Sequence, residues 1–391
     1  MPNSVSSPAL RLGRRSFLRT TATLAAGTSA TLPAGGRLAA GSERSRVGLV
    51  GCGGRGTGAA LQAATDPAVE ITSLGDLFAD QVATCAERLA RRVPAGFACP
   101  PEHRFTGPEA WRRVLESPVD VVILATPPAF RPLHVAAAVR AGRHVYCERP
   151  AAIDVAGVLA VLAACDAAAR RGLSFASGLA HRHDEATRAA VARIHAGGIG
   201  LPRAATVHAR IGSPWLVPAR PEWSAAERRL RNWISQPSLS GGHFVERHAA
   251  AIDRGLWALG DEDPAAVVPV GPPAADAVAT RVRFLFADGR SLDAALDRGG
   301  RGEPLVVESV CGTAGTADLP TGVPAADANA AAMRCLLESV RAGRPLAGGG
   351  PLCRATLAAV LGRRVAETGT SLRWADGIRE AARPPRPLQS S

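Results

Sequence analysis

Three side chains of this sequence combine the residue types and the spacing that proton transfer requires. Arg149 follows an apolar run within residues 142–152, GRHVYCERPAA. His243 and Glu246 lie three residues apart in residues 242–260, whose pattern predicts a helix, so both occupy one helical face. Histidine accepts a proton near neutral pH, whereas an arginine guanidinium stays protonated. The candidate catalytic residues are therefore His243 as the base, Glu246 as its partner and Arg149 as a fixed cation.

Each of these side chains also has a purely structural interpretation. His243 could cap or pack the start of the helix instead of taking a proton, and we give both interpretations equal weight. For Glu246 we favour an ion pair with Arg149, because a planar guanidinium and a carboxylate can pair through two hydrogen bonds. The helical period places Ala250 and Asp253 on the same face and directs His248 away from Glu246.

A second polar cluster follows the apolar run at residues 173–177. It contains His181, Arg182 and His183, at another predicted strand end. The His-x-His spacing could bind a metal, but the spacing offers no third ligand, so we predict no metal site. We expect these three residues, together with Asp253, to contact the substrate or to lie on the surface.

A glycine-rich turn predicts a nucleotide site. An apolar run at residues 46–50 ends in the pattern G-x-G-x-x-G, and a helix pattern follows it. Asp76 closes a second strand-like run 20 residues after the last of these glycines, where a dinucleotide-binding unit places the acid that binds the ribose hydroxyls. A carboxylate there repels a 2'-phosphate, which favours NAD over NADP, and a glycine turn kept for packing alone is the alternative. The predicted cofactor-binding residues are Gly51, Gly53, Gly54, Arg55, Gly56, Asp76, Thr126, Pro127 and Glu148.

Strand and helix patterns alternate from residue 46 to about residue 172. This alternation predicts a doubly wound parallel sheet, the Rossmann arrangement. The runs that end at Thr126 and at Glu148 place their polar residues at the carboxyl ends of strands, the edge at which such sheets bind ligands. Arg149 is therefore expected beside the nicotinamide.

Four segments resemble the family of glucose-fructose oxidoreductase, inositol dehydrogenase and MocA (Gfo/Idh/MocA). They are the glycine turn, ATPP at 125–128, AGRHVYCERP at 141–150 and SGGHFVERHAAAIDRGLWALG at 240–260, and the similarity covers nearly all of the chain after residue 40. The resemblance implies a nucleotide domain at 45–172 and an α+β substrate domain at 173–372 with an open, mostly antiparallel sheet. It also implies last helices that pack back on the first domain, a tail at 373–391 and a possible homo-oligomer. Strand patterns at 202–212, 276–299 and 305–319 agree with it.

The residues that usually carry this family's chemistry are changed here. The family uses a lysine in a Glu-Lys-Pro motif, and an aspartate and a histidine four residues apart on a helix; the matching positions hold Arg149, Glu246 and Ala250. We expect an NAD-dependent oxidoreductase acting on a sugar or polyol. The alternatives are a redox-neutral NAD-dependent glycosidase and a non-catalytic protein that binds nucleotide or sugar.

The first 40 residues resemble a twin-arginine export signal. Arg14 and Arg15 precede Ser-Phe-Leu, and a weakly apolar stretch rich in Ala and Thr follows. A disordered basic tail is the alternative. The signal predicts recognition by the twin-arginine export machinery and a periplasmic or other extracytoplasmic location.

Composition excludes several classes of partner. The formal charge is +12 and every one of the 46 basic residues is arginine, but without residues 1–40 there remain 41 arginines against 34 acids, or +7. The arginines are scattered and form no tract with interleaved aromatics, so we expect no nucleic-acid partner.

No apolar run has the roughly 18 to 20 residues that span a bilayer, and we expect no stable membrane insertion. The eight cysteines lack metal-site spacing, and we expect buried free thiols, although an oxidising compartment would permit a disulfide that the sequence does not assign.

Overall fold

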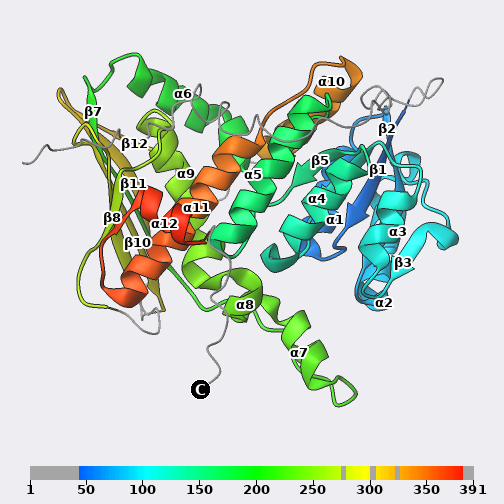
Figure 1. The fold of residues 1–391 in the computed structure, drawn as a ribbon. Helices are drawn as coiled ribbons and strands as arrows, with labels where there is room; N and C mark the ends of the chain where they lie inside the picture. Colours follow the sequence, from blue (N-terminus) through cyan, green and yellow to red (C-terminus); the bar gives the residue numbers. More distant parts are fainter. Residues whose placement is uncertain (1–43, 274–278, 300–304, 322–325, 382–391) are drawn as a thin grey trace, which may run out of the picture. The chain divides into compact units, whose positions relative to one another are not determined.

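The computed structural model describes residues 44–273, 279–299, 305–321 and 326–381, and its elements are drawn in Figure 1. The expected export signal lies outside these residues. Two sheets organise the described chain, one of six strands and one of seven.

The first sheet is parallel and has the strand order β3-β2-β1-β4-β5-β6, which confirms the doubly wound prediction. Its strands are β1 Ser45–Val50, β2 Val69–Asp76, β3 Arg104–Thr106, β4 Val121–Leu124, β5 His144–Cys147 and β6 Phe175–Ser177. The connecting helices are α1 Gly54–Ala63, α2 Ala79–Arg92, α3 Ala110–Glu116, α4 Arg131–Arg140 and α5 Val155–Arg170. All four residues of β4 have no exposed surface, as expected of a parallel strand covered on both faces. The sixth strand lies beyond the boundary expected at residue 172.

The second sheet has the order β12-β11-β7-β10-β9-β8-β13. Every neighbouring pair is antiparallel except β7 and β10, which confirms an open, mostly antiparallel sheet. Its strands are β7 Pro202–Ile211, β8 Ala266–Pro269, β9 Ala279–Leu285, β10 Ser291–Arg298, β11 Leu305–Gly312, β12 Thr316–Asp318 and β13 Leu372–Arg373. The sequence patterns missed β8, which ends in proline, and β13, which has two residues.

One face of the second sheet is apolar and the other carries ion pairs. On β10, Leu292 and Leu296 are buried, whereas Asp293 and Asp297 pair with arginines of β9 on the opposite face. Helix α9 Gly242–Ala258 packs on the apolar face. The backbone of α9 comes so close that a Cβ at Gly255 would lie 2.6 Å from Leu292 Cδ1.

The remaining helices join the two sheets or pack on them. They are α6 Glu185–His195, α7 Ala225–Arg231, α8 Pro237–Ser240, α10 Ala326–Arg341, α11 Gly349–Thr368 and α12 Trp374–Ala381. Helix α10 packs on α1, and α11 packs against both α5 and α9 (Figure 1). The tail expected at residues 373–391 therefore begins as ordered structure, because the buried side chain of Trp374 holds α12 against the core. In the described residues no helix is both long and apolar enough to cross a membrane.

Candidate functional site

The glycine turn between β1 and α1 has a shape that larger residues could not adopt. Gly51 has a φ of +96°, and a Cβ at Gly56 would lie 1.8 Å from the Gly51 oxygen. The backbone N–H of Cys52 donates to Asp76 Oδ2 at 2.7 Å, and that of Phe78 donates to Oδ1 at 3.0 Å. These bonds hold the Asp76 carboxylate beside the turn, while burial raises its pKa. The pairing fits a site for a pyrophosphate and its adjoining ribose.

A cavity of about 1140 Å³ opens at this turn. It extends along the carboxyl ends of β1, β2, β4 and β5 to the helix α9, from which Glu246 and Arg247 reach it. All nine predicted cofactor-binding residues line it: Gly51, Gly53, Gly54, Arg55, Gly56, Asp76, Thr126, Pro127 and Glu148. Arg55 and Glu148 form an ion pair at 2.7 Å, which joins the glycine turn to the end of β5.

Arg131, at the start of α4, positions the backbone at the carboxyl ends of β4 and β5. Its guanidinium donates to the main-chain oxygens of Thr126 at 2.8 Å, Glu148 at 3.0 Å and Pro150 at 2.5 Å. It is 4% exposed, and burial lowers its pKa. Thr356 adds a hydroxyl that accepts from the Ala151 N–H at 2.9 Å. The sequence analysis missed Arg131, since nothing near it in the chain reveals these three acceptors.

Arg149 and Glu246 meet in the cavity, but not as an ion pair. The Arg149 guanidinium donates to the main-chain oxygen of Glu246 at 2.9 Å, so the expected pairing with the carboxylate is wrong. Glu246 Oε2 is buried and has no hydrogen-bond partner among the described residues. Arg247 Nε lies 3.5 Å from it, too far for a good hydrogen bond. The carboxylate of this cavity-lining residue thus has one oxygen that accepts no hydrogen bond from the described residues and lies within ion-pair distance of Arg247.

His243 does not line this cavity, although it shares a helical face with Glu246. It lies one turn nearer the start of α9, half-buried, with Arg247 and Arg298 as its charged neighbours. Burial, and then these two cations, lower its pKa to about 4. The structure therefore does not bring His243 to the place where a base would act, and the packing interpretation describes it better.

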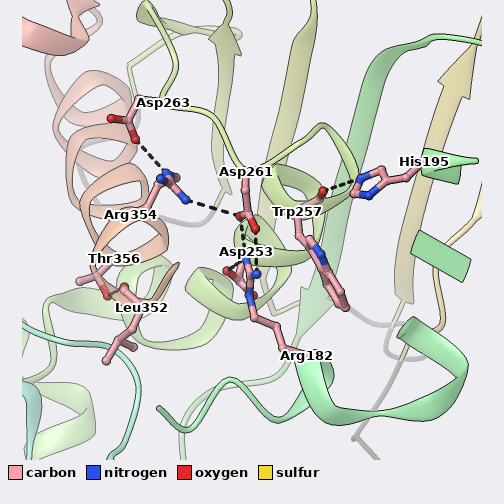
Figure 2. A network of polar contacts seen from close by, with 9 residues as sticks. All are labelled: Arg182, His195, Asp253, Trp257, Asp261, Asp263, Leu352, Arg354 and Thr356. Atoms are coloured by element: carbon pink, nitrogen blue, oxygen red, sulfur yellow. Dashed lines mark hydrogen bonds and ion pairs between the residues drawn. The ribbon is translucent and has the colours of Figure 1, made fainter. Parts of the chain in front are cut away.

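Arg182 of the second polar cluster takes part in a network of ion pairs (Figure 2), and none of the three residues of that cluster lines the cavity. Arg182 donates to both carboxylate oxygens of Asp253 at 2.8 Å and to both of Asp261 at 2.9 and 2.7 Å. Its guanidinium also lies over the ring of Trp257, 5.1 Å from the centroid. Arg354 extends the network to Asp261 and Asp263. This network ties α9 to the 3-10 turn Ala180–His183 and to α11.

The structure does not place this cluster where we expected it to contact the substrate. Asp253 is 2% exposed, and a buried carboxylate requires a paired cation, which Arg182 supplies. Seven residues of helix also separate it from Glu246 by about 10 Å along the axis. His181 and His183 lie outside the cavity lining, and burial lowers the pKa of each, to about 3 for His181.

Residues 215–234, which we call the cover segment, supply a further wall that the sequence analysis did not identify. Three of the six tryptophans of the chain fall in these 20 residues, a clustering that could have revealed it. Its cavity-lining residues are Trp215, Val217, Arg220, Trp223, Leu230, Arg231, Trp233 and Ile234.

Residues 45–176 match the family model described as "Oxidoreductase family, NAD-binding Rossmann fold". A "Glycosyl hydrolase family 109 protein" of Streptomyces coelicolor is 32% identical over 110 residues, which cover 28% of this chain and 23% of that protein. "Inositol 2-dehydrogenase 3" of Saccharopolyspora erythraea is 30% identical over 134 residues, or 34% of this chain and 35% of that protein. The matched segments thus span only a quarter to about a third of these relatives.

The fold extends further than the sequence similarity. The crystal structure of scyllo-inositol dehydrogenase from Lactobacillus casei, with bound cofactor NAD(H) and scyllo-inositol, superposes with a TM-score of 0.66 at 17% identity. The superposition covers 85% of this chain and 99% of that one. This chain therefore shares its fold with that structure over most of its length.

Proposed function

We propose that this protein belongs to the Gfo/Idh/MocA oxidoreductase family and is an NAD-dependent oxidoreductase acting on a hydroxyl group of a sugar or polyol. One observation carries the proposal. The glycine turn and Asp76, which suit a dinucleotide, line the same cavity as the Glu246 carboxylate and the Arg149 guanidinium. A cofactor and a reacting hydroxyl group can therefore meet in one cavity.

The nucleotide-binding residues fit NAD. The backbone N–H groups at the start of α1 would face a pyrophosphate, and a Cβ at Gly53 or Gly54 would meet no neighbouring atom within 4 Å, so a ligand can approach the backbone there closely. Asp76 would bind the ribose hydroxyls and repel a 2'-phosphate. Bound NAD supplies a hydride acceptor for the oxidation of an alcohol.

Glu246 is the residue that we assign to the proton. Loss of a hydride from an alcohol carbon requires that the hydroxyl proton be taken up, and Oε2 of Glu246 is a buried acceptor with no hydrogen-bond partner among the described residues. Arg149 cannot serve, because a guanidinium does not release its proton. Its bond to the Glu246 main chain instead fixes the second turn of α9 against the end of β5.

A redox-neutral glycosidase is the second candidate, and the similarity to the Streptomyces glycosyl hydrolase favours it. In that reaction the hydride would leave the sugar and return to it, with loss of the aglycone between the two steps. The same cavity and the same acid–base residue would serve both reactions.

The test is to incubate purified protein with NAD and a panel of inositols and sugars while NADH formation is followed, and with nitrophenyl glycosides while nitrophenol release is followed. NADH formation with a polyol supports the oxidoreductase. Nitrophenol release without net NADH supports the glycosidase. Nucleotide binding with neither product identifies a non-catalytic protein and refutes the proposed activity.

We also propose that the protein works outside the cytoplasm. The paired arginines Arg14 and Arg15 and the weakly apolar stretch after them support export by the twin-arginine route. Because that route carries folded proteins, the nucleotide would be bound before export.

A further inference from the structure

We infer that the cover segment acts as a clamp on the adenosine end of the nucleotide site, and that Arg231 fastens it to Asp80 and so sets the residence time of the bound nucleotide. The inference rests on the proposed function, because it requires NAD in the cavity. It assigns a role to residues that take no part in the proposed chemistry.

The fastening is an ion pair across the cavity wall. Nη1 and Nη2 of Arg231, on α7, donate to the two carboxylate oxygens of Asp80 in the first turn of α2, each at 2.9 Å. Nε of Arg231 donates to Glu227, one turn earlier on the same helix, also at 2.9 Å. All three donor nitrogens are thus engaged, in the two-bond geometry that fixes a guanidinium most firmly.

Two aromatic rings enclose the same guanidinium. It lies 3.9 Å from the ring centroid of Phe78 and 4.4 Å from that of Trp223. The Arg231 side chain is only 10% exposed as a result. An ion pair at the surface contributes little stability by itself, and stacking of the guanidinium on aromatic rings adds to it.

The position of Asp76 shows which end of the nucleotide the clamp covers. Asp76 is the expected ribose-binding acid, and Phe78 and Asp80 follow it by two and four residues. Phe78 also donates its N–H to Asp76 Oδ1. Phe78, Asp80, Trp223 and Arg231 all line the nucleotide cavity. A nucleotide bound there would leave past this contact, so breaking it should speed dissociation.

The experiment measures the dissociation rate of NADH, by its fluorescence, when excess unlabelled NAD displaces it from the full-length protein. Arg231→Ala and Asp80→Asn should each raise the rate about tenfold, with a smaller effect on association. Arg229→Ala is the matched control, because Arg229 lies exposed on the same helix, and its rate should equal that of the parent. The exchange of charges in Asp80→Arg with Arg231→Asp should slow release relative to Arg231→Asp alone.

Two outcomes are informative in different ways. Parent protein that binds no NADH overturns the proposed function and the clamp together. Parent protein that binds NADH, with rates in Arg231→Ala and Asp80→Asn within twofold of the parent, overturns the clamp and leaves the proposed function intact. Asp80→Asn keeps the shape of a half-exposed side chain, so the test does not depend on whether Arg231→Ala folds.

Discussion

Arg149 donates its hydrogen bond to the main-chain oxygen of Glu246 and not to the carboxylate of that residue. An ion pair with Arg149 would have added a second cation to the only acid that α9 contributes to the cavity lining among the described residues, whose Oε2 already lies 3.5 Å from Arg247 Nε. Because the guanidinium binds the backbone instead, the carboxylate keeps an oxygen without a hydrogen-bond partner. Arg149 thus holds the backbone of α9 and leaves the proposed acid–base role to Glu246.

Replacement of Asp76 should remove the preference for NAD. In Asp76→Ala the carboxylate no longer binds the ribose hydroxyls or repels a 2'-phosphate, so the ratio of the Kd values for NADP and NAD should fall about tenfold. Titration of each nucleotide by fluorescence gives both constants. Asp318→Ala is the control, because Asp318 is exposed on β12 of the second sheet. An unchanged ratio in Asp76→Ala would remove the basis for the cofactor assignment.

A methyl group at Gly178 should disturb the ion pair that joins the glycine turn to β5. A Cβ there would lie 2.4 Å from Glu148 Oε2, whose carboxylate binds Arg55. Gly178→Ala should therefore lower the free energy of unfolding by about 1–3 kcal/mol and weaken NAD binding. Urea unfolding and nucleotide titration measure the two effects. Gly212→Ala should change neither quantity, because a Cβ at Gly212 would meet no atom within 4 Å beyond its chain neighbours. Equal effects of the two substitutions would contradict the steric argument.

Acid should destabilise the protein through His248. Burial lowers its pKa from 6.5 to about 3, so it is neutral in the folded state. Below pH 6.5 the unfolded chain binds a proton that the folded chain does not, and stability is lost progressively from about pH 6.5 to about pH 3. At pH 5 this one residue should cost about 2 kcal/mol relative to pH 7.

The variant His248→Gln separates this effect from general acid denaturation. A glutamine amide can still donate to the Val207 oxygen, which His248 contacts at 3.1 Å, but it does not titrate. Urea unfolding at pH 7 and pH 5 should show a smaller loss of stability in the variant than in the parent. Equal losses would mean that His248 does not drive the pH dependence.

Export should depend on the two arginines of the proposed signal. Arg14→Ala with Arg15→Ala should leave the protein in the cytoplasm, whereas Arg11→Ala should not affect its location. Fractionation of cells that express each variant measures this. Normal export of the double variant would refute the assignment of the signal.

Local spacing predicted the nucleotide half of the site. The glycine turn and Asp76 depend on short-range geometry, in which a strand, a tight turn and a helix follow one another along the chain. The predicted loop residues, from Gly51 to Glu148, accordingly all line one cavity. The helix that carries Glu246 was also predicted by its period, and the direction of His248, away from Glu246 and onto the Val207 oxygen of β7, agrees with that period.

Contacts between distant segments could not be read from the same patterns. Arg182 binds Asp253 across 71 residues and Arg231 binds Asp80 across 151 residues. From the sequence alone, each arginine could have paired with any of many acidic residues. Only the folded backbone determines which acid lies close enough to form the ion pair. The same limit explains the wrong prediction of an ion pair between Arg149 and Glu246. Every residue has a main-chain oxygen, so the residue types do not reveal which of these oxygens accepts a hydrogen bond from an arginine.

The assignment of Glu246 as the proton acceptor is tested most directly by Glu246→Gln. The amide keeps the size of the side chain but cannot take a proton, so NADH formation with the best polyol should fall at least about 100-fold while the Kd for NAD stays within twofold of the parent value. Arg149→Lys, measured beside it, should lose far less, since an ammonium can still reach the Glu246 main-chain oxygen. Undiminished NADH formation by Glu246→Gln would contradict the account, because the proton would then pass to a different residue.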